Sequence, residues 1–242
     1  MGSCHMSSIR LSLGLVKPSL NNAYFRVDRA KQHLASIERE LLAASVHDRE
    51  RLQTVKSFVS ATYDPIIVIP PAPPIFGVLV GEAVYNLRAA LDYLIFELSF
   101  FDTRSIQDGT QFPIEDTPQG WRRRISKSKD PRRPNWCEFL TPIHQAAIMK
   151  LQPCAGCKWT GMLRSLSNPD KHRTLTIVQF DTQDNAAAGV SHTSMYVSHN
   201  FTIDITFDDG APVIKTLQIL QAEVTSVLDS FKTEFQIGFR QT

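Results

Sequence analysis

A cluster of ionisable side chains in the second half of the chain has the residue types of an acid–base or phosphate-binding site. It comprises Asn168, Pro169, Asp170, Lys171, His172 and Arg173. Because proline disfavours the helical conformation of the residue before it, we expect a turn at Asn168, followed by extended chain. Asp170 and His172 would then share one face, where the carboxylate can orient the imidazole as a general acid or base. Lys171 and Arg173 would share the other face, where they could clamp a phosphate or a carboxylate.

The helix expected from about Ile75 to Phe100 has one apolar side and one polar side. The apolar side consists of Val80, Ala83, Val84, Leu87, Ala90, Leu91, Leu94, Ile95 and Leu98. The polar side consists of Glu82, Tyr85, Asn86, Arg88, Asp92, Tyr93, Phe96 and Glu97. Arg88 and Asp92 are four residues apart, so they can pair on the helix surface. The aromatic content predicts a half-buried wall of fixed polar groups, and an ordinary intrahelical ion pair with aromatic packing is the alternative.

These two regions predict one site, between the polar side of the helix and the 168–173 turn. His172 would be the general acid or base, oriented by Asp170 or Asp92. Phosphate would be held by Arg88, Lys171 and Arg173. The site wall would consist of Glu82, Tyr85, Asn86, Tyr93 and Asn168. The alternative is a charged turn that caps a helix and pairs internally with Arg88 or Asp92.

Six short motifs lie between Phe76 and Phe180. They are Gly81-Glu82, Asn86-Leu87-Arg88, Ala90-Leu91-Asp92, Phe112-Pro113-Ile114, Leu151-Gln152-Pro153 and the Asn168-x-Asp-Lys-His-Arg173 turn. In this combination they resemble a family of uncharacterised bacterial proteins, whose members tend to carry His where this chain has Tyr85 and Tyr93. That family has no established activity, so the resemblance supports the location of the site and implies no reaction.

With His at position 93, the helix would carry an Arg followed five positions later by a His. This is similar to the Arg-x4–6-His motif of HEPN-domain ribonucleases, which implies a dimer that cleaves RNA without metal. In this chain Tyr93 takes that position, which removes the expected general base. Arg26 and His33 also fit the spacing, so the motif has weight only within an assembled site that includes His172.

The positive charge of the chain is concentrated in the segment Trp121–Arg133. Its basic residues are Arg122, Arg123, Arg124, Lys127, Lys129, Arg132 and Arg133, and its one acidic residue is Asp130. The net charge of this segment is +6, whereas the whole chain carries +2, so the remaining residues carry −4. Together with Trp121 and Trp136, these side chains predict a nucleic-acid-binding loop over residues 121–136. A solvated loop without a partner is the alternative.

Cys154 and Cys157 form a C-x-x-C pair, with Cys137 and His144 upstream. Structural zinc requires two close ligand pairs, and the second pair is missing. We therefore expect reduced cysteines and neither a metal nor a cofactor, with a zinc site or a redox pair as alternatives. The chain has no G-x-G-x-x-G, Walker A, G-x-S-x-G or H-E-x-x-H pattern, which argues against nucleotide-dependent oxidoreduction, P-loop hydrolysis and zincin chemistry.

Apolar periodicity predicts two further long helices, over residues 22–45 and 217–235. Shorter helices are expected over residues 117–125, 140–151 and 160–166. Strands are expected over residues 53–63, 66–69, 173–180 and 200–207, because these stretches are rich in β-branched residues or alternate in polarity. The predicted fold class is therefore α+β, with a helical core of long amphipathic helices and a small antiparallel β-sheet.

The composition, with 43% hydrophobic residues and almost balanced charge, excludes intrinsic disorder. We expect a single α+β domain over residues 6–242, with the basic loop as an insertion and residues 1–5 as a cloning scar. Prolines interrupt the longest apolar stretch, 65–81, so we expect no membrane segment. Cys137, Cys154 and Cys157 are an odd number, unsuited to a disulfide framework, so we expect a cytoplasmic, reduced protein.

The function predicted from these features is the binding of a phosphate-bearing ligand, RNA or a nucleotide. Metal-independent phosphodiester cleavage is the candidate reaction. The alternative is a non-enzymatic helical protein–protein interaction module with a buried polar network. A second copy of the chain, in a homodimer, is a further candidate partner.

Overall fold

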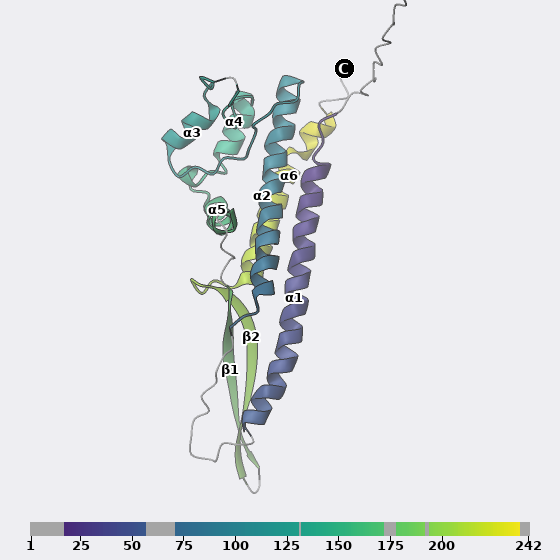
Figure 1. Cartoon of the computed structure of the whole chain (residues 1–242), viewed down its shortest axis with the longest axis vertical. Helices are drawn as coiled ribbons and strands as arrows, with labels where there is room; N and C mark the ends of the chain where they lie inside the picture. The colour runs from purple at the N-terminus through teal and green to yellow at the C-terminus, as the bar shows by residue number, and fades with distance from the viewer. Residues whose placement is uncertain (1–16, 57–70, 131, 172–177, 192–193, 238–242) are drawn as a thin grey trace, which may run out of the picture.

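The computed structural model describes residues 17–56, 71–130, 132–171, 178–191 and 194–237, and only the backbone of 45–56, 168–171, 178–179, 181–191 and 194–203. Three long helices lie side by side: α1 (Asn21–Lys56), α2 (Pro74–Thr103) and α6 (Val213–Ile237) (Figure 1). Three shorter helices lie on the side of α2 away from α1: α3 (Pro118–Ile125), α4 (Pro142–Met149) and α5 (Lys158–Lys171). A single 3-10 turn, η1 (Pro153–Ala155), precedes α5.

The core of the protein forms around α2. Every residue of the predicted apolar side of α2, from Val80 to Leu98, is buried. The stripes predicted for the other long helices join the same core, through Val27, Ala30, Leu34 and Ile37 of α1 and through Leu217, Leu220, Val224, Leu228 and Phe231 of α6. Burial of side chains of this kind stabilises a fold by about 1.5–3 kcal/mol each. The expectation of a helical core is therefore confirmed.

Both ends of α2 have residues that favour the start or the end of a helix. Pro74 occupies the first turn, where the missing N–H of proline breaks no helical hydrogen bond. At the other end Arg104 has a left-handed backbone (φ 58°), and its N–H donates to the Phe100 carbonyl at 2.9 Å. This reversal directs residues 105–117 back along α2.

A hairpin of β1 (Val178–Ser191) and β2 (Ser194–Phe207) runs beside the C-terminal half of α1 (Figure 1). Val178 lies opposite Phe207, and the antiparallel register continues to Ser191 opposite Ser194. The base of the hairpin is docked on α2, where the Phe180 ring lies edge-on to Phe76 with centroids 5.7 Å apart. In the part of the chain that is described, the sheet has two strands, and the one further bridge joins Thr206 of β2 to Pro212, so a sheet layer beside the helices is not shown.

The strand expected from residue 53 is wrong where the structure describes it, because residues 53–56 belong to α1. The preceding residues 49–53, Arg-Glu-Arg-Leu-Gln, are strong helix formers and continue the helix beyond its predicted end at residue 45. The remainder of the two expected strands, residues 57–63 and 66–69, lies outside the described residues. None of the helices described here combines the length and apolar character that crossing a membrane requires.

Candidate functional site

The predicted pairing of Arg88 with Asp92 is confirmed, and it fixes the backbone of Phe112. The Arg88 Nη2 lies 3.5 Å from the Asp92 Oδ1, and it also donates to the Phe112 carbonyl. The Phe112 N–H donates to the Asp92 Oδ1 at 2.9 Å. Arg88 is buried, and burial lowers the pKa of its guanidinium while Asp92 opposes that shift. The pair therefore attaches the segment after α2 to the helix through the backbone carbonyl and the backbone N–H of Phe112.

The opposite edge of the polar side faces α1, which contributes two residues that the sequence analysis did not assign to the site. The Arg26 Nη1 donates to the Asn86 Oδ1 at 3.3 Å, and the Arg26 guanidinium lies 5.7 Å from the Tyr93 ring centroid. The His33 Nδ1 lies 3.0 Å from a Glu82 carboxylate oxygen. Arg26 and His33 each precede a buried residue of the α1 stripe, which is the one signal in the sequence that places them beside α2.

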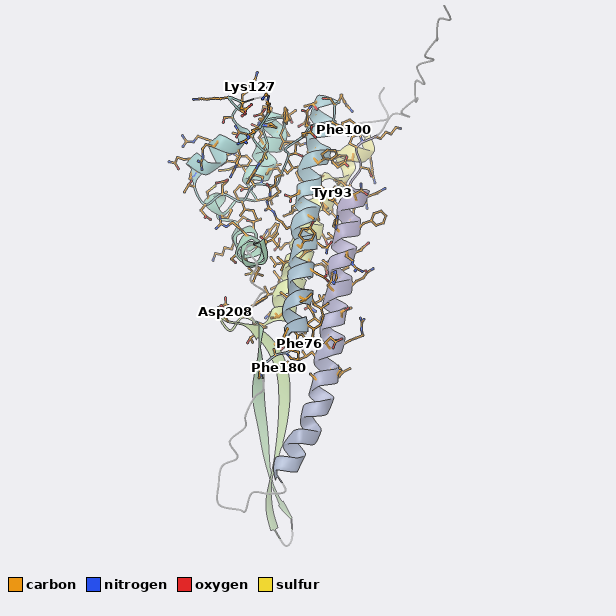
Figure 2. The ribbon with its side chains drawn as sticks, in the orientation of Figure 1. Phe76, Tyr93, Phe100, Lys127, Phe180 and Asp208 are labelled. Carbon is orange, nitrogen blue, oxygen red and sulfur yellow. The ribbon has the colours of Figure 1, made fainter. Side chains whose placement is uncertain are left out.

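Between these two edges the outer face of α2 is hollowed, and we call this feature the α2 hollow. Its volume is about 370 Å³, and it is lined by Arg26, Tyr85, Arg88, Ala89, Asp92, Tyr93, Phe96 and Thr110. Tyr85 is 54% exposed at its mouth. Figure 2 shows Tyr93 on the part of α2 that faces α1. Of the predicted site wall, Tyr93 is half-buried, Asn86 is buried, and Glu82 and Tyr85 are exposed.

The prediction of a turn and extended chain over residues 168–173 is wrong for the residues that the structure describes, 168–171. α5 continues to Lys171, so the backbone from Asn168 to Lys171 is helical and Asp170 is not on an extended strand. Pro169 lies in the last turn of α5, where proline removes a single helical hydrogen bond near the end and does not have to break the helix. The side chains of Asn168, Asp170 and Lys171, together with all of His172 and Arg173, lie outside the described residues. The joint site with Arg88 and Asp92 therefore stays a prediction.

The basic segment is built on α3 and a well-packed turn. Thr117 caps α3 by accepting the Gly120 N–H at 3.1 Å, and Trp121 is buried. Arg124 and Trp136 contact each other: the Arg124 Nε donates to Glu115 at 2.6 Å, and its guanidinium carbon lies 3.4 Å from the Trp136 ring centroid. The nucleic-acid-binding role of the loop stays a prediction. The other basic side chains are exposed, and we call them the basic surface: Arg122, Arg123, Lys127, Lys129, Arg132 and Arg133.

A third group of polar residues surrounds His144 of α4. The His144 Nδ1 lies 2.8 Å from Asp102 of α2, and its Nε2 lies 2.7 Å from Glu234 of α6. Burial lowers the pKa of His144, but the hydrogen bonds and charges of the two carboxylates outweigh burial and raise the pKa above 6.5. In the sequence His144 stood out only as a possible zinc ligand beside the cysteines. Its ring instead joins three helices, α2, α4 and α6.

Cys137 is buried, and burial raises the pKa of its thiol to about 12. Cys154 and Cys157 are half-buried and, like Cys137, carry free thiols. Within the described residues no three His, Cys, Asp or Glu side chains are arranged to hold a metal ion.

No protein-family model matches the chain, and neither a curated protein nor a solved structure is similar enough to match it. The resemblance of the α2 motifs to a bacterial family, and their similarity to the HEPN motif, stay predictions.

Proposed function

We propose that the protein binds RNA through the phosphate backbone, and that the basic surface is the binding site. The observation that carries the proposal is the exposure of six cationic side chains on one short segment. Contacts between such side chains and phosphates supply most of the affinity in sequence-independent nucleic-acid binding. Figure 2 places Lys127 at the outer end of the α3–α4 region, directed away from the long helices.

The turn that carries the basic surface is held in place by hydrogen bonds. Glu138 accepts the backbone N–H groups of Ser128 at 2.7 Å and Asn135 at 2.9 Å. The Asn135 side chain donates to the Ser126 carbonyl at 2.9 Å. A segment that is already ordered loses less conformational entropy when it binds than a flexible loop does. This order supports binding by a preformed surface.

The aromatic residues of the segment favour recognition of phosphate over recognition of bases. Trp121 is buried, and Arg124 covers Trp136. Base stacking needs an accessible ring, whereas phosphate contacts carry no sequence information. The RNA bound by this surface would therefore be selected by its charge and not by its base sequence.

The proposal is tested by the affinity of the full chain for a labelled single-stranded RNA at fixed salt. We expect Arg122→Gln combined with Arg123→Gln to weaken binding by about tenfold, because two phosphate contacts are lost. The matched control is Lys215→Gln combined with Lys232→Gln, which removes the same charge from exposed positions on α6. Equal losses in both double variants would contradict a defined site on the basic surface.

Metal-independent cleavage of the bound RNA is a separate part of the proposal, and the residue types at positions 170–173 support it. His172 would transfer the proton, and Asp170 or Asp92 would orient it. We expect His172→Ala to abolish cleavage in the presence of a chelator and to leave RNA affinity unchanged. Cleavage at an unchanged rate in this variant would remove His172 from the mechanism.

A helical interaction module is the second candidate function, and the exposed apolar residues of α1 favour it. Phe25 is 69% exposed and Leu42 is 68% exposed. The use of Arg88 and Asp92 in holding Phe112 also fits a structural role for the polar side of α2. Sedimentation measurements on the full chain and on Phe25→Ser test a homodimer: dissociation of a dimer by the substitution supports it, and a monomeric full chain contradicts it.

A further inference from the structure

We propose that the α2 hollow is a binding site for a small planar aromatic molecule that carries one anionic group. This chemistry is shared by nucleotides and by aromatic carboxylic acids. The site is distinct from the basic surface, and it does not depend on RNA binding. Its volume of about 370 Å³ lies in the range of small-ligand sites.

The spacing of residues on α2 creates a floor bordered by aromatic rings. Ala89 is four residues from Tyr85 and four from Tyr93, so the three side chains share one face of the helix. Phe96 lies seven residues from Ala89 and completes the border. The small side chain of Ala89 between larger rings leaves the space that a planar group would occupy. Stacking against such rings is tolerant of the identity of the bound ring.

The charges that line the hollow select an anion over a cation. Two guanidinium groups, Arg26 and Arg88, line it together with a single carboxylate, Asp92. Arg88 and Asp92 lie 3.5 Å apart, so their charges offset each other. The partners described for Arg26 are the Asn86 amide oxygen and the Tyr93 ring, and both are uncharged. A guanidinium has five N–H donors, and it binds phosphate or carboxylate in a planar, bidentate way.

Burial of Arg88 adds a second observation. The Arg88 side chain is 8% exposed, and its Nε is buried without a hydrogen-bond partner among the described residues. A buried donor without a partner is costly, and most such donors in proteins bind a partner or an ordered molecule. Arg88 lines the hollow, and an acceptor group on a ligand there would supply that partner once the side chains that cover Nε move aside. Thr110, on the segment held by this arginine, offers a hydroxyl at the same wall.

The test is calorimetric titration of the full chain with four probes: adenosine monophosphate, adenosine, 4-hydroxybenzoate and trimethyl-lysine. We expect binding of the monophosphate to exceed that of adenosine. Binding of 4-hydroxybenzoate as well would identify aromatic carboxylates as a source of ligands, and its failure beside the monophosphate would identify nucleotides. Preferential binding of trimethyl-lysine, or no binding of either anion, would overturn the proposal, since an aromatic site with a dominant carboxylate selects cations.

Two substitutions locate the bound probe in the hollow. Ala89→Leu fills the floor with a residue that is also a strong helix former, and we expect it to weaken the monophosphate by at least tenfold. Arg26→Gln should remove the preference for the monophosphate over adenosine. Arg29→Gln, which removes the same charge from an exposed position on α1, is the matched control and should change neither affinity. Monophosphate binding that survives both Ala89→Leu and Arg26→Gln would overturn the assignment. Arg122→Gln should leave monophosphate binding unchanged even if RNA binding is lost.

Discussion

The guanidinium carbon of Arg124 lies 3.4 Å from the centroid of the Trp136 ring, which is the contact distance of a stacked cation. The same side chain donates to Glu115 at 2.6 Å. One of the seven cations of the basic segment is therefore part of the scaffold, and the tryptophan that could have stacked on a base is covered. Arg124 therefore holds the segment in place, whereas the six residues of the basic surface remain exposed.

Arg124→Ala should disorder the turn that displays the basic surface. The substitution removes a charged hydrogen bond and a stacked cation, so we expect a loss of about 1–3 kcal/mol in the free energy of unfolding. Trp136 fluorescence should shift to longer wavelength as its ring becomes hydrated. Arg122→Ala is the control, since its exposed side chain should leave both quantities nearly unchanged. An Arg124→Ala protein with unaltered fluorescence would contradict the scaffold role.

Gly120→Ala should separate Glu115 from Arg124. A Cβ at position 120 would lie 2.2 Å from the Glu115 Oε2 and 3.2 Å from the Thr117 Oγ1. The carboxylate that pairs with Arg124 would have to move, although alanine is the better helix former by about 1 kcal/mol. We expect net destabilisation in urea unfolding, together with weaker RNA binding. Stabilisation by the full helix-propensity difference would show that Glu115 moves without cost.

The His144 cluster predicts a defined dependence of stability on pH. The pKa of His144 is raised above 6.5 in the folded protein, since Asp102 and Glu234 outweigh the effect of burial. Its contribution to stability is therefore complete below pH 6.5 and is lost as the pH rises through the folded-state pKa. Thermal unfolding midpoints between pH 6 and pH 9 should fall more steeply for the native protein than for His144→Gln. A parallel fall in both proteins would contradict the raised pKa.

Removal of Arg88 should destabilise the protein strongly, whereas removal of Tyr85 should not. Arg88→Met leaves the Phe112 carbonyl and the one-third exposed Asp92 carboxylate without their common partner, and losing hydrogen bonds to a charged group of this kind costs about 1.5–3 kcal/mol. Tyr85→Ala changes an exposed position on the same helix and should stay within about 0.5 kcal/mol. Urea unfolding of the two variants checks this difference, and a similar small effect in both would mean that the network around Phe112 contributes little.

The sequence was sufficient to predict the elements whose pattern is local. The apolar side of α2 follows from the 3.6-residue period, and the Arg88–Asp92 pair follows from a spacing of four residues. Arg26 and His33 could not be assigned to the polar side of α2, because they reach it only through the packing of α1 against α2. Arg26 and its partner Asn86, for example, are 60 residues apart in the sequence.

The error at Asn168 came from a local rule that the surrounding structure overrides. The expectation of a turn there assumed that Pro169 breaks the helix, but in the last turn of α5 only one hydrogen bond is at stake. The sequence also does not reveal the contacts of Arg124. Its neighbours Glu115 and Trp136 lie nine and twelve residues away, and only the fold of the segment brings all three together.

The central claim, that the basic surface binds RNA by its phosphates, is tested most directly by the salt dependence of affinity. The slope of log K against log salt for single-stranded RNA is about −0.7 for each phosphate contact. For Arg122→Gln combined with Arg123→Gln, the slope should be shallower than in the native protein by about 1.4. The Lys215→Gln and Lys232→Gln control should keep the native slope. A native slope in the Arg122→Gln and Arg123→Gln protein would contradict binding at this surface.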